Sequence, residues 1–203
     1  DWSSDVCSSD LACSSTCWVI ESRLKSDGSL NWATTSEPDD GTLDSARAVT
    51  HDGTNLYIAG FENGGTLSET NCKTGNGCYR VEPRRATDGL LNWASTTAQR
   101  GGTGALPRAI EYDEASGDLY IAGRDNTTDS GIIMSITTTN LLNWRYLNIV
   151  GGEATDLTFD SNNIYVTGLD QGNNCDDPSD NTCWRIQSRA KTDGSINWTV
   201  EPG

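Results

Sequence analysis

The sequence predicts an all-β fold that is built from repeated four-stranded antiparallel sheets. Three observations carry this prediction. A segment that ends in a turn and a tryptophan occurs four times along the 203 residues, and a second segment with two short strands lies between successive copies. Within both segments inward-facing side chains recur at every second residue, a period that is typical of strands and not of helices.

The first repeated segment places a tight turn four residues before its tryptophan. Gly28, Gly89 and Gly194 occupy this turn in three copies, and glycine readily adopts the left-handed backbone that a hairpin requires. Asn140 takes the same position in the remaining copy, because asparagine tolerates that backbone best after glycine. The four copies align without gaps as residues 17–32, 78–93, 129–144 and 183–198. Their inward-facing pairs are expected to include Trp18 with Ile20, Tyr79 with Val81, and Trp184 with Ile186.

The second repeated segment has the pattern of a strand, a tight polar turn and a β-branched strand that ends in glycine. It covers residues 46–60, 105–123 and 153–168. The inward-facing pairs of its first strand are expected to be Val49 with His51, Ile110 with Tyr112, and Leu157 with Phe159. His51, the only histidine, shares its column with two aromatic residues. We therefore expect it to pack on a strand face and not to act as a catalytic base.

Two hairpins per unit give four antiparallel strands, which is the composition of a β-propeller blade. The units are a half blade at residues 17–35 and complete blades at residues 46–96, 107–147 and 154–200. A propeller ring usually has about four to eight blades, so roughly three and a half blades predict an open arc. The end blades of such an arc expose apolar faces that a neighbouring blade would cover.

Residues 1–11, DWSSDVCSSDL, are expected to lie outside this fold. They resemble the translation of a sequencing-library adapter, and we expect them to be disordered. The β-propeller fragment is therefore expected to span residues 12–203.

The repeated segments also resemble known families. Copies such as AKTDGSINW (190–198) resemble the tryptophan-docking repeats of quinoprotein-like propellers, and the whole unit is similar to bacterial SBBP-type β-propeller repeats. The resemblance implies that one tryptophan per unit docks between adjacent blades as a structural wedge. These residues are Trp32, Trp93, Trp144 and Trp198. The resemblance implies a fold, and a fold does not by itself imply a function.

Cysteines other than Cys7 form three local pairs, each just before the third strand of a unit. The pairs are Cys13 with Cys17, Cys72 with Cys78, and Cys175 with Cys183. We expect three disulfides, each of which stabilises the fold by about 2–3 kcal/mol because it restricts a loop. Zinc is the alternative, but the segments CKTGNGC and CDDPSDNTC lack the spacing of zinc ligands. Disulfides indicate an extracytoplasmic protein that is secreted, periplasmic or attached to the cell surface.

One acidic loop is a candidate calcium site, and no other cofactor is expected. Oxygen ligands of the kind that calcium prefers lie close together in this loop. They are Asp170, Asp176, Asp177 and Asp180, with Asn173 and Asn174 between them. The ligand order of an EF-hand is absent, so a merely solvated loop is the alternative.

A column of charged residues recurs on the third strand of three units. Arg23, Arg84 and Arg189 each follow an acid or amide by two residues and therefore share its strand face. The acids and the amide are Glu21, Glu82 and Gln187. We expect these residues to form ion pairs between adjacent blades and not a binding site.

Composition narrows the function. A net charge of −15 argues against nucleic acid as a partner, and no apolar run is long enough to span a membrane. No nucleophile with a base, phosphate-binding motif or acid pair is apparent, so no catalytic residue is predicted. We expect a non-catalytic, monomeric scaffold that binds a protein or a carbohydrate. The alternative is a fragment of a quinoprotein (PQQ) dehydrogenase, whose cofactor would need charged residues from several blades.

Overall fold

The computed structural model describes nine ranges of the chain, and all of them belong to antiparallel sheets or to the turns between strands. The ranges are residues 17–36, 45–62, 78–92, 97–99, 105–125, 130–139, 141–150, 152–171 and 182–200. Within these ranges there is no helix, and hence none with the length and hydropathy that a membrane crossing requires. The prediction of an all-β fold made of antiparallel sheets is confirmed. Residues 1–11 lie outside the described ranges.

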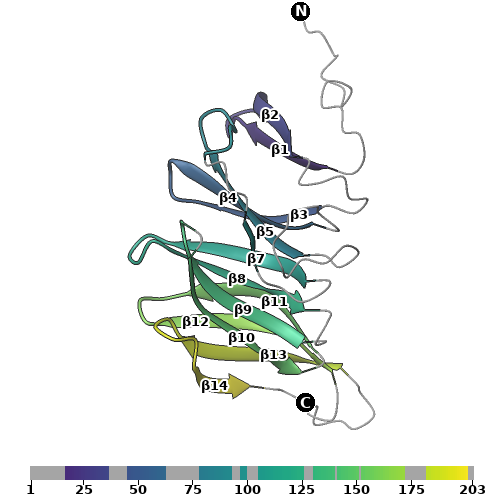
Figure 1. Cartoon of the computed structure of the whole chain (residues 1–203), viewed down its shortest axis with the longest axis vertical. Helices are drawn as coiled ribbons and strands as arrows, with labels where there is room; N and C mark the ends of the chain where they lie inside the picture. Colours follow the sequence, from purple (N-terminus) through teal and green to yellow (C-terminus); the bar gives the residue numbers. More distant parts are fainter. Residues whose placement is uncertain are drawn as a thin grey trace, which may run out of the picture.

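Four sheets stack face to face in sequence order along the long axis of the molecule (Figure 1). Sheet 1 consists of β1 (Trp18–Arg23) and β2 (Leu30–Ser36). Sheet 2 consists of β3 (Ser45–His51), β4 (Asn55–Glu62), β5 (Cys78–Arg85) and β6 (Thr97–Gln99). Sheet 3 consists of β7 (Ala105–Asp113), β8 (Asp118–Asp125), β9 (Ser130–Thr137) and β10 (Leu142–Val150). Sheet 4 consists of β11 (Glu153–Phe159), β12 (Asn163–Gln171), β13 (Thr182–Ala190) and β14 (Ile196–Val200).

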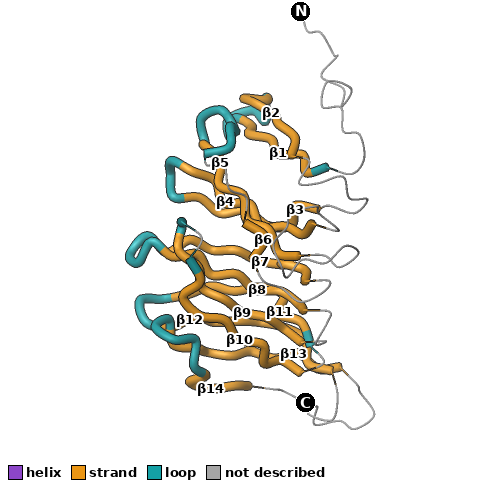
Figure 2. Tube along the Cα trace, viewed as in Figure 1, coloured by secondary structure: helices purple, strands orange, loops and turns teal. Residues whose placement is uncertain are grey.

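Each sheet is a meander in which strands adjacent in sequence are hydrogen-bonded neighbours. The tight turns between the first and second strands, and between the third and fourth, therefore fall at one edge of the stack, where Figure 2 shows most of the turns in teal. Gly28, Gly89 and Gly194 have φ values of 74°, 71° and 73° in these turns, as predicted. Asn140 lies outside the described residues.

The third copy of the tryptophan segment is one residue shorter at its turn than the other copies. Trp32 and Trp198 pair with Ser22 and Ser188, and Trp144 pairs with Ser135. The turn before Trp144 closes with a bond from the Thr137 N–H to a carbonyl four residues later, whereas the same bond spans five residues elsewhere. The gap-free alignment is therefore wrong by one residue within β9. Without a glycine in the left-handed conformation, a shorter turn replaces the Asp-Gly turn.

Packing between the sheets follows the period of two along each strand. Leu119 and Ile121 of β8 join the core between sheets 2 and 3, whereas Tyr120 and Ala122 join the core between sheets 3 and 4. All four side chains are at most 1% exposed, so sheet 3 is buried on both faces. A smaller core of Trp18, Ile20 and Ile58 lies between sheets 1 and 2.

The predicted inward column is correct inside the stack and wrong at its ends. Ile110 and Leu157 are each 4% exposed, but Val49 is 60% exposed and His51 is also exposed. Val49 faces sheet 1, which contributes only two strands among the described residues and leaves it uncovered. Trp184 is 51% exposed for a similar reason, because it lies on the face of sheet 4 that points away from sheet 3.

Glycine at the end of the second strand lets the neighbouring sheet approach closely. A Cβ atom at Gly60 would collide with the Trp18 ring of sheet 1, and one at Gly123 would collide with the Tyr79 hydroxyl of sheet 2. Each would also collide with a carbonyl of the first strand in its own sheet, that of Ser45 or Leu106. That hydroxyl donates a hydrogen bond to the Leu106 carbonyl at 3.2 Å. An aromatic side chain of one sheet therefore fills the notch that glycine leaves in the next sheet.

Substitution Gly123→Ala should lower the free energy of unfolding by about 1–3 kcal/mol, because the added methyl overpacks this notch. Chemical denaturation monitored by tryptophan fluorescence measures the effect. Thr158→Ala, at an exposed position of β11, is the control and should change stability by less than about 0.5 kcal/mol. Equal stability of Gly123→Ala and the unmodified chain would contradict the close approach.

Candidate functional site: contacts between sheets and an open groove

Two of the predicted tryptophan wedges lie across the junction between adjacent sheets. The Trp32 Nε1–H of sheet 1 donates to the Ala86 carbonyl of sheet 2 at 3.1 Å. The Trp144 Nε1–H of sheet 3 donates to the Lys191 carbonyl of sheet 4 at 3.0 Å. The same indole rings cover Gly89 and Gly194, where a Cβ atom would come within 2.6 Å of the ring. Each of these turn glycines thus has two roles: it adopts the left-handed backbone conformation, and its lack of a side chain leaves room for the indole ring.

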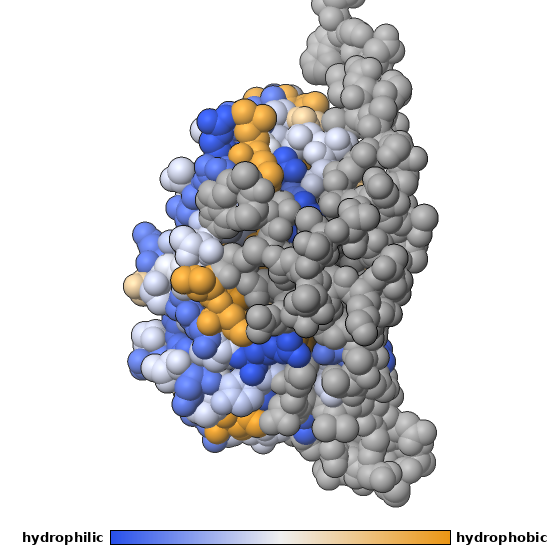
Figure 3. All heavy atoms as spheres, in the orientation of Figure 1, coloured by the Kyte–Doolittle hydropathy of each residue, from blue (hydrophilic) through white to orange (hydrophobic). Residues whose placement is uncertain are grey.

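The other two tryptophans differ from this pair. Trp93 lies outside the described residues. Trp198 lies on the outward face of sheet 4, contacts the Tyr165 ring at a tilt of 41° with ring centroids 6.2 Å apart, and is 45% exposed. Figure 3 shows hydrophobic residues at the surface near the sheet 4 end of the stack. Hydrophilic residues lie between this patch and the hydrophobic patches nearer the middle of the stack. Trp198 therefore lies on an end face where no turn among the described residues lies beneath its indole ring.

The charged column lies within strands, and the predicted ion pair between sheets is wrong. Arg84 Nε donates to Glu82 Oε2 at 2.9 Å on the same strand, and Arg84 Nη1 donates to the Gly89 carbonyl at 2.9 Å. Arg189 binds Gln187 and the Gly194 carbonyl in the same way. Residues two apart on a strand share a face and lie closer than the roughly 10 Å that separates stacked sheets. The arginine therefore fixes the turn of its own sheet.

Arg189 and a further arginine on the same face as Glu82, Arg80, also contact an aromatic ring of the neighbouring sheet. Arg189 lies 5.3 Å from the centroid of Tyr146, and Arg80 lies 5.8 Å from that of Trp18. Both are cation–π contacts with the preceding sheet, of the kind that contributes about 0.5–2 kcal/mol each. Glu82 also accepts a hydrogen bond from the Ser36 hydroxyl of sheet 1. The charged residues Glu82, Arg84 and Arg189 are thus engaged in contacts within and between the sheets.

An aspartate and a tyrosine tie the turn of the first hairpin to its second strand. The Tyr57 hydroxyl donates to Asp52 at 2.8 Å, and the Tyr165 hydroxyl donates to Asp160 at 2.7 Å. Burial alone would raise the pKa of Asp52, but hydrogen bonds from Asn55, Thr54 and Tyr57 lower it to about 2. The segments DGTNLY (52–57) and DSNNIY (160–165) carry a shared sequence signal for this contact, which sequence analysis missed.

In sheets 2, 3 and 4, the asparagine before the tryptophan reaches across the third strand to the start of the second strand. Asn92 Nδ2 donates to the Asn55 side chain at 2.6 Å, and Asn197 Nδ2 donates to Asn163 at 2.9 Å. Asn143 makes the equivalent bond to Asp118 in sheet 3 at 2.9 Å. In the recurring Asn-Trp dipeptide, the asparagine therefore links strands of one sheet, and the tryptophan, in the case of Trp32 and Trp144, contacts the next sheet.

A lysine forms a further crosslink between sheets 3 and 4. Lys191 Nζ lies 2.6 Å from Asp113 Oδ2 and 4.3 Å from the centroid of Phe159. Burial would raise the pKa of Asp113, but hydrogen bonds from Lys191 and Ser116 outweigh it and lower the pKa. A lysine held by a carboxylate and an aromatic face serves as a structural cation. It lines a polar hollow of about 530 Å³ together with Trp144.

The predicted metal and cysteine residues lie only partly within the described ranges. Asp170 is fully buried and forms an ion pair with Arg185 at 2.8 Å. The other three aspartates of the calcium prediction, Asp176, Asp177 and Asp180, lie outside the described residues. Among the residues that are described, no three His, Cys, Asp or Glu side chains could together hold a metal ion.

Cys17 and Cys183 each take part in a disulfide. Cys13, Cys72 and Cys175 lie outside the described residues, and Cys78 is described only as the first residue of β5. The pairing of the cysteines therefore stays a prediction.

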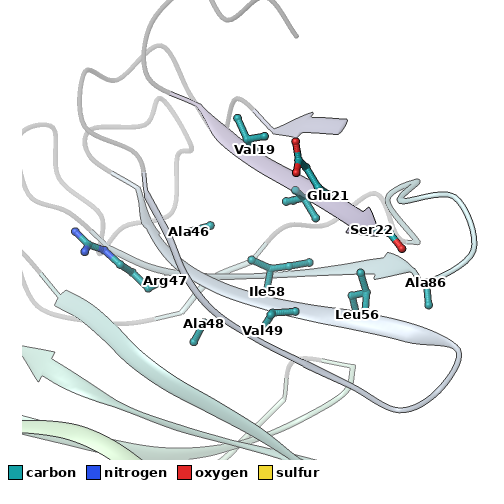
Figure 4. A pocket seen from close by; sticks show the side chains of 11 residues that line it. Val19, Glu21, Ser22, Ala46, Arg47, Ala48, Val49, Leu56, Ile58 and Ala86 are labelled. Carbon is teal, nitrogen blue, oxygen red and sulfur yellow. The ribbon is translucent and has the colours of Figure 1, made fainter. Parts of the chain in front are cut away.

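A groove of about 500 Å³ opens between sheet 1 and sheet 2 (Figure 4). Val19, Ile20 and Glu21 of β1 line one wall. The other wall is formed by side chains of β3 and β4, which are largely apolar. These include Ala46, Val49, Leu56 and Ile58. Figure 4 shows Val49, Leu56 and Ile58 on the β3–β4 hairpin beneath β1. The groove is thus an apolar slot beside a two-stranded sheet.

No protein-family model matches the chain, and no curated protein sequence matches it.

The two tryptophans Trp144 and Trp198 offer a matched test of docking. Trp144→Ala should lower the free energy of unfolding by about 2–4 kcal/mol, since it removes packing and a hydrogen bond between sheets. Trp198→Ala, on the open end face, should cost less than about 1 kcal/mol. Urea denaturation of both variants measures the difference. Equal losses would show that the indole stabilises its own sheet and not the junction.

Proposed function

We propose that the chain is part of a β-propeller that serves as a non-catalytic scaffold in a secreted or cell-surface protein. Its long connections would form the surface that binds a protein or a carbohydrate. The observation that carries the proposal is the division of the stack into two edges. Tight, hydrogen-bonded turns occupy one edge. The strand ends that lead into the connections between second and third strands, and between consecutive sheets, lie at the opposite edge.

The ends of β4 and β12 illustrate this second edge. β4 ends at Glu62 and β5 begins at Cys78, and β12 ends at Gln171 and β13 begins at Thr182. The equivalent connection of sheet 3 is short, from Asp125 to Ser130. Connections that vary in length on a constant framework are typical of binding surfaces. The disulfide-bonded Cys17 and Cys183 lie at the same edge and support an oxidising compartment.

The polar residues that a catalytic site would need are engaged elsewhere. Arg84, Arg189, Asp52 and Lys191 all hold turns or join sheets, as described above. Polar groups used in this way repeat with the sheets, whereas catalytic groups are placed irregularly to fit one substrate. This supports a scaffold over an enzyme.

Shortening one connection tests the proposal. Residues 172–181 are replaced by the sequence of residues 126–129, which joins the equivalent strands in sheet 3, and Cys183→Ser removes the unpaired thiol. Immobilised chain is screened against arrays of glycans and peptides, and dissociation constants are measured for the ligands found. We expect the shortened variant to lose at least about tenfold in affinity, because the loss of one or two interface contacts costs about 1.4 kcal/mol or more.

The control for this experiment is Thr192→Ala, which changes an exposed residue at the turn edge and should bind normally. Undiminished binding by the shortened variant would overturn the assignment of the binding edge. Stoichiometric binding of PQQ with calcium would overturn the scaffold assignment itself, since that cofactor defines the enzyme alternative.

A further inference from the structure

We propose that the groove between sheets 1 and 2 is a docking site for a β-hairpin of the same kind as β3–β4, whose second strand pairs with the open edge of β1. The proposal concerns a surface distinct from the loop edge, and it depends on the equivalence of the four sheets. It gives a role to the exposed His51, which neither the core nor the proposed binding edge uses.

β1 occupies the position of a third strand but lacks the neighbour that third strands have. Arg23 binds Glu21 and the Gly28 carbonyl, as Arg84 and Arg189 bind their partners in β5 and β13. β5, β9 and β13 each pair with a strand on both sides, whereas β1 pairs with β2 alone in the described part of the chain. An exposed strand edge offers a row of hydrogen-bonding groups to an incoming strand.

Sheet 2 is uncovered at the place where that missing neighbour would lie. Ile110 of sheet 3 is buried because it packs against Tyr57 and Ala59 of the preceding first hairpin. Leu157 of sheet 4 is buried in the same way by Tyr120 and Ala122. Val49 is the equivalent residue of sheet 2, and it lines the groove with 60% of its surface exposed. The groove therefore has the position of a first hairpin.

The two occupied junctions define the chemistry of the occupant. In each, the second strand of the hairpin carries tyrosine and alanine two residues apart, as Tyr57 with Ala59 and Tyr120 with Ala122. Tyr57 stacks on Tyr112 with centroids 5.9 Å apart, and Tyr120 meets Phe159 edge-on at 5.5 Å. His51 is the residue equivalent to Tyr112 and Phe159, because all three lie opposite the first apolar residue of the second strand. The occupant's tyrosine would therefore lie on His51.

A second copy of this chain is a poor occupant. Each of its hairpins β3–β4, β7–β8 and β11–β12 already pairs its second strand with the third strand of the same sheet. Docking would require that pairing to break. The occupant is therefore a hairpin whose second strand has a free edge and the sequence pattern Tyr-Ile-Ala-Gly.

A hairpin peptide with the sequence of residues 105–125 tests the proposal on the full chain. The peptide is titrated to about 1 mM, and it is also attached to the chain through a Gly-Ser linker of about 30 residues, because an isolated hairpin is marginally stable in water. We expect the exchange of β1 backbone amides to slow at least about tenfold with the attached hairpin. The melting temperature should rise by about 2–4 °C or more.

Two variants of the groove give the controls. Val49→Asp should weaken peptide binding at least about tenfold, since it places a charge against apolar residues. Leu141→Asp, at a position that is 67% exposed and remote from the groove, should leave binding unchanged. His51→Tyr should tighten binding about twofold to tenfold, because it restores the aromatic pair of sheet 3.

Unchanged β1 exchange with the attached hairpin, or equal binding by Val49→Asp and the unmodified chain, would overturn the proposal. Either outcome would leave the loop-edge assay unaffected, because that assay uses no hairpin.

Discussion

The structure depends on the burial of both faces of each sheet by its neighbours. A single four-stranded sheet with apolar side chains on both faces cannot cover them, so it is stable only within a stack. Sheet 3 meets this requirement, with Leu119 and Ile121 directed to one neighbour and Tyr120 and Ala122 to the other. Burying each large side chain contributes roughly 1.5–3 kcal/mol, which makes the junctions between sheets the principal source of stability.

Close packing of the faces accounts for the polar residues as well. Polar groups that lie between sheets must be paired, since an unpaired buried group costs about 1–3 kcal/mol. Arg84 and Arg189 meet this condition through a carboxylate or amide on their own strand and a turn carbonyl. Arg189 also contacts the Tyr146 ring of the preceding sheet. Among the described residues, the surfaces that the stack leaves open include the groove beside β1 and the outward face of sheet 4, where Trp184 and Trp198 are exposed.

The sequence was sufficient to predict what local chemistry determines. Alternation gave the strands, and Gly28, Gly89 and Gly194 marked turns that do have a left-handed backbone. Properties that depend on a neighbour were harder to predict. Val49 has the sequence context of Ile110, yet it is exposed because no hairpin of the described residues covers it. The shift at Ser135 depends on the length of one turn. The charged residues were predicted to pair between sheets, because the sequence does not show whether an arginine binds an acid on its own strand or one on the adjacent sheet.

The central claim is that the sheets stabilise one another through their faces, and hydrogen exchange of the backbone amides tests it most directly. The slowest exchange should occur in β8 and β9, whose sheet is covered on both sides, and exchange should become faster toward β1 and β14 at the ends. Such a gradient is expected if neighbours supply the stability. Equal protection of β1, β8 and β14 would contradict the claim, because it would mean that each sheet is stable by itself.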